Sequence, residues 1–107
     1  MRLLILCRRH YHLGPGEAEA WLGEQLEDVM RRDGLDASSL TRLEHARENA
    51  PREWDWLIEF EVDDEARAAA LEAGGACGEL LADMRLLGMS PTAALAADPK
   101  TIDERPS

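Results

Sequence analysis

The sequence predicts an α+β domain in which a strand, a helix, two strands, a helix and a final strand follow one another. Two observations carry this prediction. Residues 53–62 alternate apolar and mostly acidic side chains over a full strand length, which is typical of a strand with one buried face. Residues 17–33 instead repeat apolar side chains at three- and four-residue spacing, which is typical of an amphipathic helix.

The remaining elements are less regular. Residues 2–9 are apolar on both alternating faces at first, which favours a central strand covered on both sides. Residues 39–47 alternate poorly, as an edge or bulged strand does. A second helix is expected to begin after a cap at Asp63 or Asp64 and to end at Gly88, with a bend or close packing at its internal glycines. Residues 92–97 are expected to form the last strand.

Length and composition limit the classes of protein. The chain has 107 residues, enough for one domain, which we place at 1–98 with a polar tail at 99–107. The formal net charge is −10, which argues against nucleic acid and anionic membranes as partners, because both are bound mainly through Lys and Arg.

The cellular location is predicted from the short apolar run near the start of the chain and from the two cysteines. The apolar run Leu3–Leu6 is followed at once by Arg8, so it is too short for a signal-peptide core or a membrane span. The lone thiols Cys7 and Cys77 show no metal-binding spacing and are expected to be buried and reduced. We therefore expect a cytoplasmic protein without a metal or cofactor, and the high Arg and Ala content favours a GC-rich bacterial genome.

The predicted order is that of a ferredoxin-like βαββαβ fold, an antiparallel sheet with two helices on one face. The opening strand Arg2–Arg9 and the aromatic-rich strand Trp54–Val62, which leads directly into the acidic cap Asp63–Asp64, resemble the dimeric α/β-barrel superfamily. That superfamily includes antibiotic-biosynthesis-type monooxygenases, muconolactone isomerases and stress-responsive A/B-barrel proteins. The resemblance implies a homodimer with its two sheets face to face.

Two functions follow from this resemblance. One is a cofactor-free enzyme or binding protein that holds a small aromatic or polyketide-like molecule between the sheets. The other is a dimerising or stress-associated module without chemistry of its own. Converging polar groups in an apolar pocket would favour the first function.

The histidines are the candidates for acid–base chemistry. His10 and His12 follow the first strand two positions apart, so both imidazoles can face one site, and His45 lies on the irregular second strand. The alternative is that all three are surface histidines. A metal site through His10 and His12 would need a third ligand, which the nearby sequence lacks.

Glu59 is the fourth catalytic candidate, because it shares a strand face with Asp55 and Glu61. The alternative is that these acids pair across strands with Arg8 or Arg9. The candidates for contacting a ligand are Tyr11, Trp54 and Trp56, and the alternative for both tryptophans is the hydrophobic core.

Overall fold

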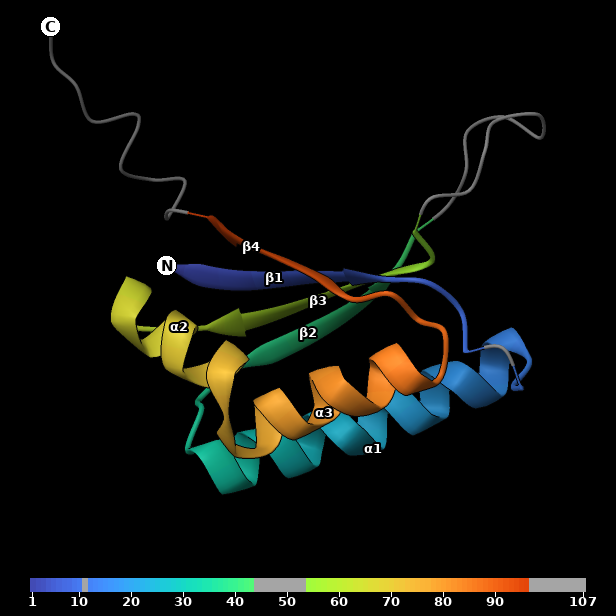
Figure 1. Ribbon diagram of the computed structural model, residues 1–107, viewed down its shortest axis with the longest axis horizontal. Helices are drawn as coiled ribbons and strands as arrows, with labels where there is room; N and C mark the ends of the chain where they lie inside the picture. Colours follow the sequence, from blue (N-terminus) through green and yellow to red (C-terminus); the bar gives the residue numbers. More distant parts are fainter. Residues whose placement is uncertain (11, 44–53, 97–107) are drawn as a thin grey trace, which may run out of the picture.

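A computed structural model describes residues 1–10, 12–43 and 54–96 and contains four strands and three helices in these ranges. The elements in chain order are β1 (Arg2–Cys7), α1 (Pro15–Asp33), β2 (Ser38–Arg42), β3 (Trp56–Glu61), α2 (Glu65–Ala73), α3 (Gly75–Leu86) and β4 (Thr92–Ala96). The strands form one antiparallel sheet in the order β2-β3-β1-β4 (Figure 1). The α+β class is therefore confirmed, and the arrangement is compatible with a ferredoxin-like fold.

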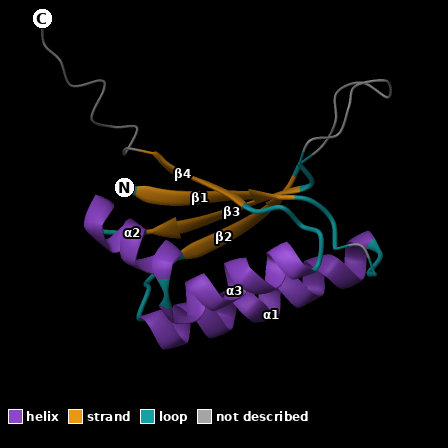
Figure 2. Cartoon of the chain, in the orientation of Figure 1, coloured by secondary structure: helices purple, strands orange, loops and turns teal. Residues whose placement is uncertain are grey.

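The described helices all lie on one side of the sheet, with α1 and α3 side by side beneath it and α2 at one end (Figure 2). The core fills the space between these layers. Alternate residues of β1 and β3 point into it, and these side chains are at most 1% exposed: Leu3, Ile5, Cys7, Trp56, Ile58 and Phe60. The alternation predicted for residues 53–62 is confirmed for the part that forms β3.

The positions of β1 and β2 in the sheet also agree with the sequence. β1 lies between β3 and β4, as its apolar side chains on both faces predict, although helices cover only one of those faces among the described residues. β2 lies at the sheet edge, as its weak alternation predicts. It is shorter than the predicted 39–47, and residues 44–53 lie outside the described part of the chain.

The second predicted helix is two helices, α2 and α3, which meet at Gly74 and Gly75. Asp64 caps α2 by accepting the backbone N–H of Arg67 at 2.8 Å, which confirms the predicted cap. Gly75 has a φ of +66°, a left-handed conformation that changes the direction of the chain between α2 and α3. The expected bend is thus a complete break in the helix.

The break is fixed by a contact from α1. Asp33 accepts the backbone N–H groups of Ala76 and Cys77 at 2.9 and 2.8 Å, so its carboxylate satisfies two free donors in the first turn of α3. Arg67 on α2 donates to the carbonyl oxygen of Asp33. Three helices therefore meet at this one aspartate.

None of the helices in the described ranges is both long and apolar enough to cross a membrane. The predicted tail at 99–107 lies outside those ranges.

Candidate functional site

The sheet face opposite the helices is the main candidate surface, and we call it the open face. Side-chain alternation places Arg2, Leu4 and Leu6 of β1 and Leu57, Glu59 and Glu61 of β3 on it. Leu4, Leu6 and Leu57 are partly exposed, whereas their neighbours on the helix side are buried. The open face therefore has an apolar centre that no helix in the described residues covers.

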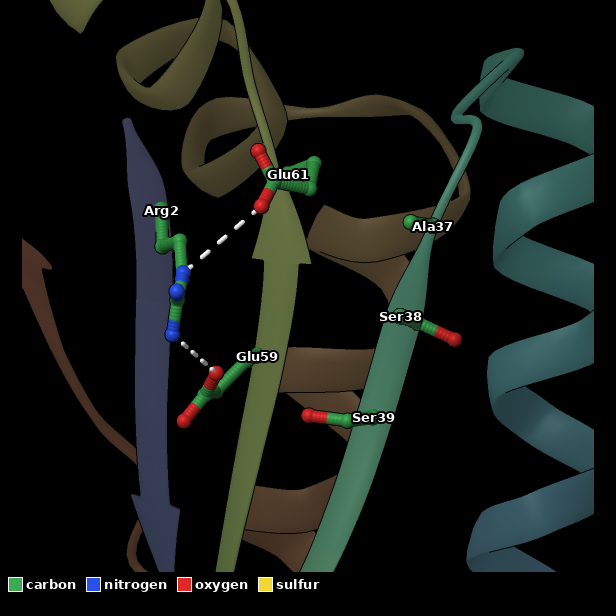
Figure 3. Close-up of a pocket in the computed structure, with 6 residues that line it drawn as sticks. All are labelled: Arg2, Ala37, Ser38, Ser39, Glu59 and Glu61. Carbon is green, nitrogen blue, oxygen red and sulfur yellow. Dashed lines mark hydrogen bonds and ion pairs between the residues drawn. The ribbon is translucent and has the colours of Figure 1, made fainter. Parts of the chain in front are cut away.

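One end of the open face carries a cluster of charges. The Arg2 guanidinium donates a hydrogen bond to the Glu59 carboxylate at 3.0 Å and lies 3.6 Å from a carboxylate oxygen of Glu61 (Figure 3). We call these three residues the Arg2 cluster. The pairing of strand acids with arginine is confirmed for Glu59 and Glu61, but the expected partner was wrong: it is Arg2, not Arg8 or Arg9.

The Arg2 cluster lines a shallow hollow of about 130 Å³. Ala37, Ser38 and Ser39 of the β2 edge complete its lining, and Figure 3 shows Ser39 pointing toward Glu59 while Ser38 points away. A pocket for a drug-sized ligand has a volume of roughly 300–1,000 Å³. The hollow in one protomer is smaller than that, so it can hold only a small group.

The other end of the open face is formed where β1 ends and β3 begins. The Arg8 guanidinium lies 5.7 Å from the centre of the Trp54 ring, a cation–π contact. The Asp55 carboxylate accepts the backbone N–H of Arg9 at 2.8 Å. Trp54 therefore lies beside Arg8 at this end of the open face and is half-buried. Its role in contacting a ligand stays a prediction.

His10 and His12 lie beside each other, with their ring centres 6.1 Å apart, but in different surroundings. His10 is 7% exposed and packs edge-on against Trp21 of α1, with the ring centres 5.7 Å apart. Its Nδ1 atom accepts the backbone N–H of His12 at 3.1 Å, while the His12 side chain is exposed. The hydrogen bond gives His10 a structural task in the turn that follows β1.

The structure also separates the histidines from Glu59. Glu59 is opposite Leu4, near the start of β1, whereas His10 and His12 follow the other end of that strand. The residues around the hollow include Glu59 and neither of these histidines. His45 and Tyr11 lie outside the described residues, so their predicted roles stay predictions.

Trp56 belongs to the core and not to the open face. Its side chain is 1% exposed, and its indole N–H donates to the Glu19 carboxylate at 3.3 Å. Glu19 also accepts a two-point contact from Arg42, and these hydrogen bonds, that of Arg42 first, lower the pKa of its carboxyl group. Of the alternatives for Trp56, the structure therefore favours core packing.

The cysteines have the character of core residues. Burial, with a smaller contribution from Asp55, raises the pKa of the Cys7 thiol to about 12. Burial first, and then Asp33 and Glu72, raise the pKa of the Cys77 thiol to about 12. Both thiols are therefore protonated at neutral pH, and neither has the character of a nucleophile. No group of three or more His, Cys, Asp or Glu residues in the described ranges is arranged to hold a metal ion.

The sequence did not single out Arg2 as a site residue. It shares a strand face with Leu4 and Leu6, and it reaches Glu59 and Glu61 only because β1 and β3 pair in one register. The alternation of Glu59 and Glu61 on the next strand was the available signal, but the register that selects Arg2 over Arg8 is a property of the folded sheet.

Comparison with known proteins gives a fold and no family. No family model matches the chain, and no curated protein matches it either. Among solved structures, the chain is similar to the protein At3g17210 from Arabidopsis thaliana, whose crystal structure was treated by ensemble refinement. The TM-score is 0.65 with 13% sequence identity, and the match covers 91% of this chain and 95% of the Arabidopsis chain. At this identity the likeness shows a shared fold alone.

Proposed function

We propose that this chain is a dimerising module of the dimeric α/β-barrel type, in which the open faces of two copies meet. The observation that carries the proposal is the partly exposed apolar centre Leu4, Leu6 and Leu57, which lies opposite a fully packed helix layer. Apolar surface left on a sheet of this size commonly marks an interface. A second copy would supply the missing second layer over the open face.

The placement of the candidate catalytic residues favours a module over an enzyme. His10 is held by Trp21 and the His12 backbone, His12 is exposed, and Glu59 is bound to Arg2 at the opposite end of the sheet. An acid–base site requires such groups to converge on one reacting molecule. In one protomer, the two histidine rings lie 6.1 Å apart, but Glu59 is near the opposite end of β1, so the described candidates do not all converge on one point.

Small-molecule binding is the second candidate function, and the hollow at the Arg2 cluster supports it. The hollow is open toward the side on which a second copy would lie, and the apolar centre of the open face is next to it. Two open faces would therefore enclose a space with apolar walls and polar ends, which suits a small aromatic or polyketide-like molecule. A bacterial origin and a cytoplasmic location stay predictions.

Native mass spectrometry of the freshly purified protein tests both functions. We expect a dimer mass without added mass for the module, and a dimer with added non-covalent mass for the binding protein. A monomer at micromolar concentration would contradict both, because each function needs the second copy.

A further inference from the structure

The open face has an ordered pattern that decides how two copies can meet. Strand pairing places residues of all four strands in rows across the sheet. One row contains Ala37, Glu61, Arg2 and Ala96, and the next contains Ser39, Glu59, Leu4 and Ala94. The third row contains Thr41, Leu57, Leu6 and Thr92. In these three rows, charge thus lies toward the Arg2 end and apolar side chains lie toward the centre of the face.

The opposite end of the open face lies just beyond the last residues of β1 and β3. The Arg8 guanidinium lies 5.7 Å from the centre of the Trp54 ring there, and the Asp55 carboxylate accepts the backbone N–H of Arg9. Both ends of the face therefore have an arginine on the β1 side, with carboxylates opposite it at the Arg2 end and an aromatic ring opposite it at the Arg8 end.

The sheet order limits a symmetric dimer to two simple arrangements. The centre of the sheet lies between β3 and β1. A two-fold axis through this centre and along the strands places β1 over the partner's β3, with equivalent ends of the sheets together. A two-fold axis across the strands places β1 over the partner's β1, with opposite ends together.

The charged residues that would face each other distinguish these two arrangements. With the axis along the strands, Arg2 faces Glu61 of the partner subunit, and Arg8 faces the Trp54 end of the partner subunit's β3. With the axis across the strands, Arg2 faces Arg8 of the partner subunit. The first arrangement brings opposite charges together at the Arg2 end and an arginine near an aromatic ring at the other end, whereas the second brings arginines together.

Resting on the proposed dimer, we infer that two copies meet with the two-fold axis along the strands and that Arg2 of each copy pairs with Glu61 of the other. The contacts within one protomer leave room for this pairing. Glu61 is 3.6 Å from Arg2, beyond hydrogen-bond distance, and its side chain is 51% exposed. Sheets that pack face to face lie about 10 Å apart, which a long arginine and a glutamate can span together.

The test mixes two charge-reversed variants of the full chain, Arg2→Glu and Glu61→Arg. Each substitution creates repulsion within its own protomer, and the mixed dimer carries the mean of the costs in the two homodimers, so these costs cancel from the ratio of mixed dimers to homodimers. Only the mixed dimer has opposite charges at both cross-subunit contacts, while each homodimer has like charges at both. We expect the ratio of mixed dimers to homodimers to exceed the statistical ratio by about tenfold, since attraction replaces repulsion at two sites.

The variants differ in mass, so native mass spectrometry counts the three dimers after mixing and re-equilibration. A matched control mixes Arg85→Glu on α3 with Glu27→Arg on α1, which have the same charge changes on exposed helix positions. This control pair should give the statistical ratio. Circular dichroism of each variant before mixing checks that it is folded.

Cross-linking gives a second readout with near-native charges. In the inferred arrangement, Ser39 of β2 lies over Ala94 of the partner subunit's β4, because these residues share a row at opposite sheet edges. A mixture of Ser39→Cys and Ala94→Cys chains should therefore be joined by a short bis-maleimide. The native thiols stay unmodified, because both are buried. Cross-linking of Ser39→Cys chains to each other would instead indicate the axis across the strands.

The outcomes separate this inference from the proposed function. Excess mixed dimer together with the Ser39–Ala94 cross-link supports the inferred arrangement. A statistical mixture of dimers overturns the arrangement but leaves the dimer in place, since the alternative arrangement gives no preference. A monomeric wild-type chain overturns both.

Discussion

Arg2 lies between two carboxylates, and its two contacts differ in length and exposure. The Arg2 and Glu59 side chains are 38% and 24% exposed and 3.0 Å apart, whereas Glu61 is 3.6 Å away and 51% exposed. We expect Glu59→Gln to lower the free energy of unfolding by about 0.5–1 kcal/mol, at the upper end for partly exposed pairs. Urea denaturation at a fixed protein concentration measures this change.

Glu27→Gln, at an exposed position of α1, is the control for that prediction and should change the free energy of unfolding by less than Glu59→Gln. A double-mutant cycle of Glu59→Gln with Arg2→Gln isolates the ion pair. Simple additivity in this cycle would show that Glu59 does not depend on Arg2, and a catalytic role for Glu59 would then regain support.

Cys7 gives a pH-dependent prediction. Burial raises the pKa of its thiol from 9.0 to about 12, so the folded protein keeps a proton that the unfolded chain loses above pH 9. The folded state then binds more protons, and the free energy of unfolding decreases as the pH rises from about 9 to 12. Each such thiol contributes about 1.4 kcal/mol per pH unit in that range.

Comparison of wild type with Cys7→Ala isolates this contribution from the other groups that titrate at high pH. The variant will be less stable at neutral pH, because it leaves a cavity in the core. Its free energy of unfolding should nevertheless fall less steeply with pH. Equal slopes for the two proteins between pH 9 and 11 would contradict the burial of a protonated thiol.

At the scale of elements, the break between α2 and α3 depends on Gly75. A Cβ atom at this position would lie 2.8 Å from a carboxylate oxygen of Asp33, and the φ of +66° is unfavourable for any side chain. We expect Gly75→Ala to lower the free energy of unfolding by about 1–3 kcal/mol, since strain and loss of the Asp33 cap add together. Thermal or urea unfolding measures this change in the free energy of unfolding.

Gly74→Ala provides a matched control on the adjacent residue. Gly74 has an extended φ of −170°, and a Cβ atom added there would meet nothing within 4 Å beyond its chain neighbours, so this substitution should be nearly neutral. If both substitutions had the same effect, the left-handed conformation and the Asp33 contact would not be what fixes the break.

The same break shows where prediction from the sequence stops. The alternation of Trp56, Ile58 and Phe60 sets the buried face of β3 locally, so that face was predictable. The apolar residues of 66–84 also keep the three- and four-residue spacing of a helix, and this spacing continues across the glycines. One bent helix was expected for that reason. The break itself requires Asp33, more than forty residues away in sequence, so no local pattern contains it.

The candidate site follows the same division. The acidic face that includes Glu59 was visible as alternation, and its pairing with an arginine was foreseeable from opposite charges on neighbouring strands. The choice of Arg2 depends on strand register. His10 and His12 were expected to lie together because of extended backbone; their rings do lie 6.1 Å apart, but a turn in which His10 accepts the His12 backbone N–H places them there.

At the scale of the whole molecule, the proposed dimer predicts different effects for apolar residues on its two sides. Leu57 lies at the centre of the open face, in a row with Leu6, and Leu86 lies on α3 with 79% of its surface exposed. A dimer through the open face would bury Leu57 and leave Leu86 in water. Leu57→Lys should therefore weaken dimerisation at least about tenfold, because a buried unpaired ammonium is costly.

Leu86→Lys is the control, with the same change of residue on the helix side, and it should leave the dissociation constant within about twofold. Sedimentation equilibrium over a range of concentrations measures both constants, and urea unfolding checks that each variant is folded. Dissociation by Leu86→Lys with an intact Leu57→Lys dimer would move the interface to the helix layer. That result would also leave the open face as a surface for a different partner, since its apolar centre would still need to be covered.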